Sequence, residues 1–133
     1  LKRLGLADAA TSILSTEEFL PAVGQGIIAI EAREDDTRTR ALLAAIDDRD
    51  AATALACERA FLAVLDGSCR TPIAGHATLR EGALQFRGLI ARPDGSEVVE
   101  TARAGAVADA AALGADAGAE LKRRASADFF APV

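Results

Sequence analysis

The chain has 133 residues, of which half are apolar and 26% are charged, a composition typical of a globular protein. Its formal net charge of −5 argues against a broad basic surface for nucleic acid. No stretch approaches the roughly 20 apolar residues that a membrane helix needs. We therefore expect neither a nucleic-acid partner nor a membrane partner, and the length suits one domain, or one domain with part of another.

The N-terminal part of the chain contains a turn signal followed by an apolar run. Gln25 lies between Gly24 and Gly26, and residues 27–30 (IIAI) follow directly. We expect a glycine turn that leads into a buried strand. An unpaired strand would leave its N–H and C=O groups without a ladder, so we expect its sheet to lie in residues outside this chain. The absence of methionine agrees with this, because it indicates a processed product or a fragment.

Two helical stretches are also expected before residue 48. The sequence LKRLGL (1–6) predicts the end of a helix that stops at Gly5. Asp36 predicts the N-cap of a helix over residues 37–46. The inner face of that helix is expected to carry Leu42, Leu43 and Ile46.

The polar stretch DDRD (47–50) is the best candidate for a domain boundary. We therefore divide the chain into an incomplete part, residues 1–48, and a C-terminal domain, residues 49–133. Helical spacing of apolar residues predicts one helix over 51–65, ended by Gly67, and another over 108–124. The predicted inner residues are Ala54, Cys57, Phe61, Val64 and Leu65 in the first helix, and Val107, Ala110, Leu113, Ala117 and Leu121 in the second. A short turn over 126–130 is expected to bring in Phe129 and Phe130.

Three strands are expected between these helices, at residues 73–80, 83–91 and 97–104. Glu81-Gly82 predicts a tight hairpin, and RPDGSE (92–97) predicts a second turn. The predicted fold class is α+β, a three-stranded antiparallel sheet with helices on one face, preceded by a fragment of α/β domains.

The two cysteines differ in their surroundings. Cys57 lies on the apolar stripe of a helix, so we expect a buried structural thiol. Cys69 follows the small residues Gly67 and Ser68, just after a predicted helix end. It could be a loop thiol without a role, or a catalytic thiolate with His76 as its base. The partial negative charge at the C-terminal end of a helix disfavours a thiolate. We expect His76 to be a strand residue and not a positioned base.

Two further roles for Cys69 remain. A zinc site is disfavoured, because two cysteines and one histidine do not supply four ligands. A covalent anchor is compatible with the sequence, since a thiol that is alkylated once needs exposure and reach but no strongly lowered pKa.

Several stretches resemble one enzyme family along essentially the whole chain. The sequence contains, in order, LPAVGQG, IAIEAR, ERAFLAVLDGSC, TPIAGHA and DGS. Together these motifs resemble porphobilinogen deaminase, also called hydroxymethylbilane synthase. The resemblance implies the end of the second domain and a return segment to the first domain in residues 1–48. It implies a complete cofactor-tethering third domain in residues 49–133.

The resemblance also implies an activity in porphyrin and haem biosynthesis. The family is a transferase that joins four porphobilinogen molecules into the linear tetrapyrrole hydroxymethylbilane, and it releases ammonia at each step. The polypyrrole grows on a dipyrromethane cofactor. Loss of ammonia from porphobilinogen gives a carbon electrophile that a soft sulfur can capture. The implied partners are porphobilinogen, the growing polypyrrole and the missing N-terminal domains of the same protein.

Three residues of this chain match functional positions of the family. Cys69 matches the cysteine that holds the dipyrromethane through a thioether, although Ser68 stands where the family commonly has glycine. Gln25 matches a glutamine at the cofactor and substrate cleft, and Arg3 matches an arginine that binds the acetate and propionate carboxylates of the pyrroles. The essential aspartate is implied upstream of this chain, which should be inactive alone and should bind no metal.

Two alternatives from other classes stay open. One is a non-enzymatic α+β domain that binds a small ligand or a partner protein. The other is a thiol hydrolase that uses Cys69 and His76. The resemblance further implies a cytoplasmic monomer.

Overall fold

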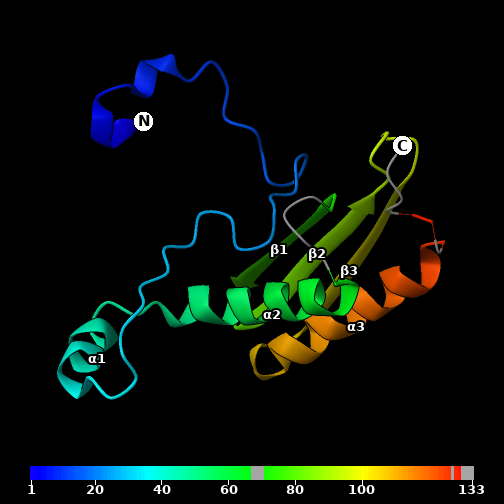
Figure 1. Ribbon diagram of the computed structural model, residues 1–133. Coiled ribbons are helices and arrows are strands. Elements are labelled where there is room, and N and C mark those ends of the chain that lie inside the picture. The colour runs from blue at the N-terminus through cyan, green and yellow to red at the C-terminus, as the bar shows by residue number, and fades with distance from the viewer. Residues whose placement is uncertain (67–70, 127, 130–133) are drawn as a thin grey trace.

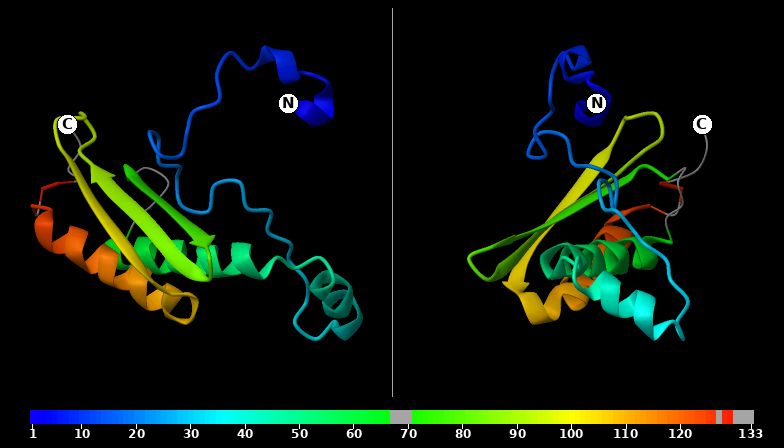
Figure 2. Two further views of the ribbon diagram at one scale, coloured as in Figure 1. Left: turned by 180° about the vertical axis from the view of Figure 1, so that it is seen from behind. Right: turned by 90° about the vertical axis from the view of Figure 1, so that its left-hand side faces the viewer.

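The computed structural model describes residues 1–66, 71–126, 128 and 129. Its main body is an α+β unit of two helices and a sheet: α2 (Arg49–Leu65), β1 (Ile73–Arg80), β2 (Ala83–Ala91), β3 (Val98–Ala106) and α3 (Ala110–Arg124). The strands form an antiparallel sheet in the order β1-β2-β3. Figures 1 and 2 show α2 and α3 side by side on one face of this sheet. The predicted fold class is confirmed.

The tight hairpin between β1 and β2 follows from two residues. Arg80 pairs with Ala83, and the loop between them is Glu81 at φ 53° and Gly82 at φ 78°. Two successive positive φ values are typical of the type I′ turn, which matches the twist of the strands it joins. The second hairpin pairs Ala91 with Val98 across residues 92–97. The third strand therefore begins one residue later than predicted and ends two residues later, at Ala106.

The core lies between the sheet and the two helices. Phe61 of α2 packs against Phe86 of β2 with ring centroids 5.0 Å apart. Gly75 and Gly88 face each other across β1 and β2, and a Cβ on either one would meet Phe61. The alternation in β2 is as predicted, with Leu84, Phe86, Gly88 and Ile90 buried. The other buried apolar residues are Cys57, Leu65, Ala77, Val99, Ala110, Ala117, Leu121 and Phe129.

The two helices cross at unusually short range. A Cβ on Gly114 of α3 would clash with the carbonyl oxygen of Cys57 in α2. One turn further along α3, a Cβ on Gly118 would lie 2.8 Å from the carbonyl oxygen of Phe61. Glycine is therefore required at both positions for the backbones to approach this closely. The predicted inner residues of α3 are buried or half-buried, but its two glycines make the closest contacts with α2.

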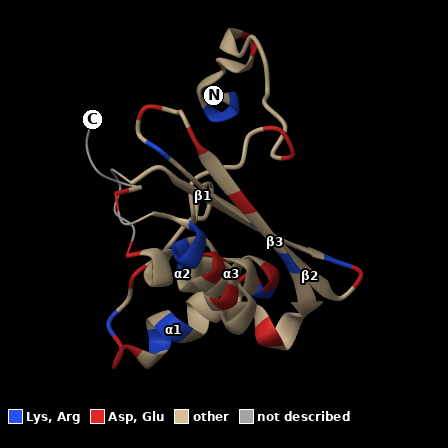
Figure 3. Ribbon diagram, turned by 90° about the vertical axis from the view of Figure 1, so that its right-hand side faces the viewer, with Lys and Arg blue, Asp and Glu red and all other residues tan. Residues whose placement is uncertain are grey.

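Charged residues of β3 and α3 form an ion-pair cluster beside the core. Arg103 donates to Asp116 at 2.6 Å and to Glu120 at 2.7 Å, and Arg124 also donates to Glu120. The hydrogen bonds from Arg103, then Thr101 and Arg124, lower the pKa of Glu120 to about 2. The cluster therefore stays ionised at neutral pH and ties α3 to β3. Figure 3 shows acidic and basic segments interspersed over these elements.

The C-terminal turn is held by Arg92, which follows β2. Its guanidinium lies 5.1 Å from the ring centroid of Phe129 and donates to Ser126. Phe129 is buried, as predicted, whereas Phe130 lies outside the described residues. Among the helices that the structure describes, none has both the length and the apolar character needed to cross a membrane.

The N-terminal part was predicted to contain an apolar strand and two helical stretches. Residues 27–30 belong to no strand within this chain, and Ile28 is 88% exposed. The physical reason is that none of the described residues offers them a ladder. Asp36 is the N-cap of the helix α1 (Thr37–Ala44), as predicted, and its carboxylate accepts from Thr39. The helix ends two residues earlier than predicted, and Leu42 and Ile46 are exposed. Its predicted inner face is therefore not buried here. The predicted helix end at residues 1–6 is a single 3-10 turn, Lys2–Leu4, that stops at Gly5.

Candidate functional site

The turn around Gln25 is the best-defined element of the predicted site. Gly24 and Gly26 have φ values of 71° and 83°, which confirms the glycine turn. The N–H of Gln25 donates to the carbonyl of Ala22 at 3.0 Å, and that of Ile27 donates to Gly24 at 3.3 Å. The backbone thereby leaves Gln25 at the tip of the turn, where its side chain is exposed.

This turn is docked on the edge of the sheet at β1. The carbonyl of Pro21 accepts from the N–H of Gly75 at 3.1 Å. Val23 packs against the core. The N–H of Gly24 donates to Oε2 of Glu58, a residue of α2, at 2.8 Å. These contacts hold residues 21–24, which come immediately before Gln25, against β1 and α2, although both elements are distant in the sequence.

Glu58 is a functional candidate that the sequence analysis did not single out. Its side chain is buried, with 5% of the residue exposed, and its second oxygen, Oε1, accepts from the N–H of Ala77 in β1 at 2.8 Å. The available signal was its position on α2, one residue after Cys57 and three before Phe61, inside the apolar stripe. A carboxylate at such a position needs hydrogen-bond donors, and only the fold reveals that they are backbone groups.

The stretch that contains Cys69 lies between α2 and β1. Residues 67–70, and with them Cys69, lie outside the described residues. The helix α2 begins at Arg49, two residues earlier than predicted. It ends at Leu65, as predicted, and Asp66 after it takes the left-handed conformation with φ 54°. Aspartate tolerates this conformation better than most residues. Cys69 thus belongs to the connection between the two elements that also hold the Gln25 turn.

Cys57 is excluded as an exposed tether. It is completely buried, and burial raises its pKa to about 11, with a further contribution from the negative charge of Glu58. A thiol with this pKa stays protonated at neutral pH and is a poor nucleophile. The prediction of a buried structural thiol is confirmed.

Arg3 lies apart from the other candidates. It is exposed in the 3-10 turn Lys2–Leu4, and Figures 1 and 2 show this N-terminal segment extending away from the sheet. The structure therefore does not bring Arg3 to the Gln25 turn, and its predicted role stays a prediction.

His76 is a strand residue, as expected. It lies in β1 opposite Arg87 of β2, on the face of the sheet away from the helices. Arg87 pairs with the carboxylate of Glu17 at 3.2 Å. A small cavity of about 70 Å³ between these strands and residues 16–20 is lined by both His76 and Arg87.

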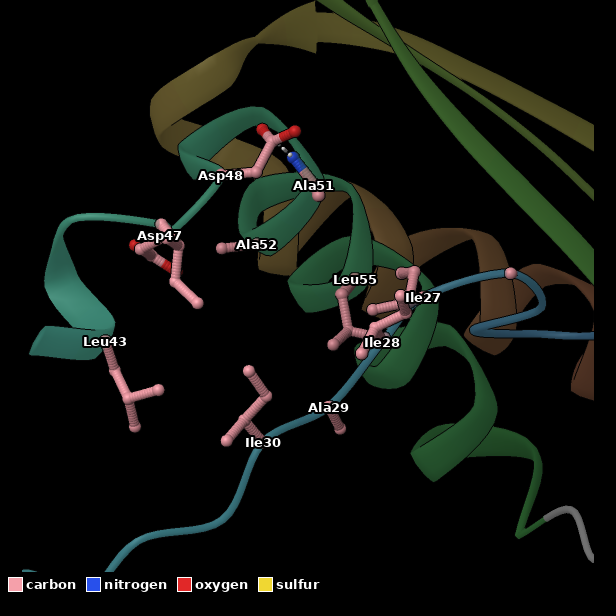
Figure 4. A pocket seen from close by; sticks show the side chains of 12 residues that line it. Ile27, Ile28, Ala29, Ile30, Leu43, Asp47, Asp48, Ala51, Ala52 and Leu55 are labelled. Atoms are coloured by element: carbon pink, nitrogen blue, oxygen red, sulfur yellow. Dashed lines mark hydrogen bonds between the residues drawn. The ribbon is translucent and has the colours of Figure 1, made fainter. Parts of the chain in front are cut away.

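An apolar groove of about 570 Å³ lies between residues 26–30 and the helices α1 and α2. Figure 4 shows Ile27 and Ile28 beside Leu55 of α2, with Ile30 and Leu43 on opposite sides of the open space. The groove begins directly after the Gln25 turn. The turn therefore lies between residues 21–24, which are docked on the sheet and α2, and an apolar surface that is exposed to solvent.

Comparison with known protein families accounts for both parts of the chain. The family model described as "Porphobilinogen deaminase, C-terminal domain" matches residues 52–123, which is more than half of the chain. The chain belongs to the porphobilinogen deaminase family. A second model of this family, for the "dipyromethane cofactor binding domain", matches residues 1–41, which include Arg3 and Gln25.

Curated porphobilinogen deaminases are similar over almost the whole chain. The protein of that name from Nitrobacter winogradskyi is 62% identical over 130 residues, and that from Nitrobacter hamburgensis is 61% identical. The one from Paracoccus denitrificans is 56% identical. The aligned residues make up 98% of this chain but only 41–42% of the relatives. The two family-model matches leave residues 42–51 between them, and the predicted domain boundary after residue 48 stays a prediction.

Proposed function

We propose that this chain is the C-terminal portion of a porphobilinogen deaminase, which joins four porphobilinogen molecules into hydroxymethylbilane and releases ammonia. The observation that carries the proposal is the similarity to proteins of that name, at up to 62% identity over 98% of the chain. The two porphobilinogen deaminase family models also match in successive parts of the chain. The proposed setting is tetrapyrrole synthesis in the cytoplasm.

Cys69 is the proposed attachment point of the dipyrromethane cofactor. The chain has two cysteines, and Cys57 is buried with a pKa near 11, so its sulfur is neither accessible nor ionised. This leaves Cys69 as the thiol suited to a thioether. When bound, the cofactor supplies a terminal pyrrole carbon to which further pyrrole units are added.

Gln25 and Arg3 are the proposed polar contacts of this chain with the pyrroles. The exposed amide of Gln25 can donate to a carboxylate, and the glycine turn fixes the backbone that carries it. Arg3 can bind a carboxylate through two parallel N–H donors. Both residues serve binding and orientation. The proton transfers are assigned to the aspartate expected upstream, so this chain alone is expected to be inactive.

The proposed partner of the apolar groove is the N-terminal part of the same protein. The relatives are more than twice as long as the part of them that aligns with this chain. Ile28, Ile30 and Ile46 line the groove and are all more than half exposed, where a packed partner would bury them. This agrees with the expectation that residues 27–30 join a sheet formed by other residues.

The proposal is tested on the full-length protein that contains this chain. Incubated with porphobilinogen, it should release ammonia and form a linear tetrapyrrole. Its intact mass should exceed the polypeptide mass by two linked pyrroles, and an acidic aldehyde reagent should colour it. A full-length protein with no pyrrole adduct and no porphobilinogen consumption would instead favour a non-enzymatic binding domain. Loss of an unrelated hydrolytic activity on thiol alkylation would favour a thiol hydrolase.

Replacing Arg3 with alanine should raise the KM for porphobilinogen at least about tenfold, the effect of losing one or both charge-assisted hydrogen bonds to the carboxylate. The melting temperature should not change, because Arg3 is exposed and lies outside the core. Steady-state kinetics of the full-length protein check this. Lys2→Ala is the matched control, and an Arg3→Ala variant with the KM of the control would reject the assigned role.

A further inference from the structure

Glu58 joins three parts of the molecule through one buried carboxylate. The residue lies on α2, Oε2 accepts from Gly24 in the turn before Gln25, and Oε1 accepts from Ala77 in β1. Both donor–acceptor distances are 2.8 Å, and 5% of the residue is exposed. Among the ion pairs of the residues that the structure describes, none includes Glu58.

A buried carboxylate without a cation is costly unless hydrogen bonds satisfy it. Among the described residues, both of its donors are backbone N–H groups, and such bonds to an ionised acceptor are stronger than neutral ones. Leucine at position 58 would suit the apolar stripe of α2, but it could not accept either bond. Binding these two N–H groups therefore accounts for a glutamate at this buried position.

The two N–H groups have different origins. Ala77 belongs to the outer edge of the sheet, where the N–H of Gly75 is already taken by the carbonyl of Pro21. Gly24 belongs to the turn, and its φ of 71° is the conformation that turns the chain toward Gln25. Glu58 thus fixes the backbone immediately before Gln25 relative to a rigid helix and strand.

We propose that Glu58 is a positioning residue for Gln25: its carboxylate holds the 21–26 turn on α2 and β1, so that the exposed amide of Gln25 meets the pyrrole carboxylates in one orientation. The inference rests on the proposed function for the identity of the ligand. The anchoring itself rests on the hydrogen bonds of this chain alone.

The first test measures the anchor without using activity. In the full-length protein, Glu58→Gln replaces one acceptor oxygen with an NH₂ donor, so one of the two N–H groups loses its partner. Amide hydrogen exchange should accelerate at least about tenfold at whichever of Gly24 and Ala77 loses its acceptor, as expected for loss of a hydrogen bond to a charged group. Glu100→Gln, the same change at an exposed residue of β3, should leave both rates unchanged. Unchanged exchange at both Gly24 and Ala77 in Glu58→Gln would overturn the proposal.

The second test asks whether Glu58 acts through Gln25. Glu58→Gln and Gln25→Ala should each raise the KM for porphobilinogen about tenfold with little change in kcat, and the double variant should be no worse than either. Multiplying effects in the double variant would mean that Glu58 acts independently of Gln25, which would overturn the proposal.

Two further measurements separate the possible failures. Should Glu58→Gln not fold, Glu58→Asp keeps the charge but shortens the reach, and it should give the same exchange and KM changes. A wild-type full-length protein that forms no tetrapyrrole would reject the proposed function instead, while the exchange result would still decide the anchor.

Discussion

Replacing Gly114 with alanine is expected to destabilise the α+β unit by about 2 kcal/mol or more, although alanine is the better helix former. The added Cβ would clash with the carbonyl oxygen of Cys57, which is backbone and cannot rotate away. The helices α2 and α3 would have to separate, and this would loosen the core around Phe61. Urea unfolding should show a lower midpoint, and thermal unfolding a melting temperature lower by about 8 °C or more.

A control variant separates packing from helix propensity. Ala111 lies on the exposed side of α3, so Ala111→Gly should cost only the helix propensity, about 1 kcal/mol. Propensity alone predicts that Gly114→Ala stabilises the protein by a similar amount. A rise in the unfolding midpoint of Gly114→Ala would therefore contradict the close helix crossing, since the two explanations predict opposite signs.

Replacing Cys69 with serine should abolish both the pyrrole adduct and tetrapyrrole formation in the full-length protein. The serine hydroxyl is a much weaker nucleophile toward a carbon electrophile than a thiolate, so no stable thioether equivalent is expected. The intact mass should equal the polypeptide mass, and product formation should fall below detection, a loss of several orders of magnitude. Mass spectrometry and the acidic aldehyde reaction measure the adduct, and the disappearance of porphobilinogen measures turnover.

The matched control for Cys69 is the second cysteine. Cys57→Ala removes a thiol that is buried and protonated at neutral pH, so the adduct and the activity should both remain, with a modest loss of stability from the small cavity. An active Cys69→Ser protein without an adduct would refute the tether. Loss of the adduct in a normally folded Cys57→Ala protein would mean that the cofactor is attached to Cys57 and not to Cys69.

Much of the α+β unit could be predicted from the sequence because its signals are local. The alternation of β2 and the apolar stripe of α2 follow from periodicity, and Glu81-Gly82 indicates the hairpin directly. The sequence was less informative where a residue depends on a distant partner. The run at residues 27–30 is apolar, but an apolar run forms a strand only where another strand pairs with it. No sequence pattern indicated the role of Gly114 in helix packing, because that role depends on the backbone of α2.

The candidate site could be predicted only in part, and chiefly by resemblance. Gln25 was expected in a glycine turn, and its two neighbours have the positive φ values that such a turn needs. The assignments of Arg3 and Cys69 came from the family motifs and remain proposals. Glu58 was missed because its two donors lie 34 residues before it and 19 residues after it, a separation that no local pattern reports.

The way in which β1 is covered has a consequence for the solubility of the protein. An outer strand with free N–H groups invites other polypeptides to add to the sheet, which is a common start of aggregation. Here the N–H of Gly75 donates to the carbonyl of Pro21, which has no N–H of its own. The N–H of Ala77 donates to the buried carboxylate of Glu58. Neither group can continue a ladder, because proline cannot donate and a carboxylate offers no strand. The contacts that orient the turn thus also keep this edge from recruiting strands of neighbouring molecules.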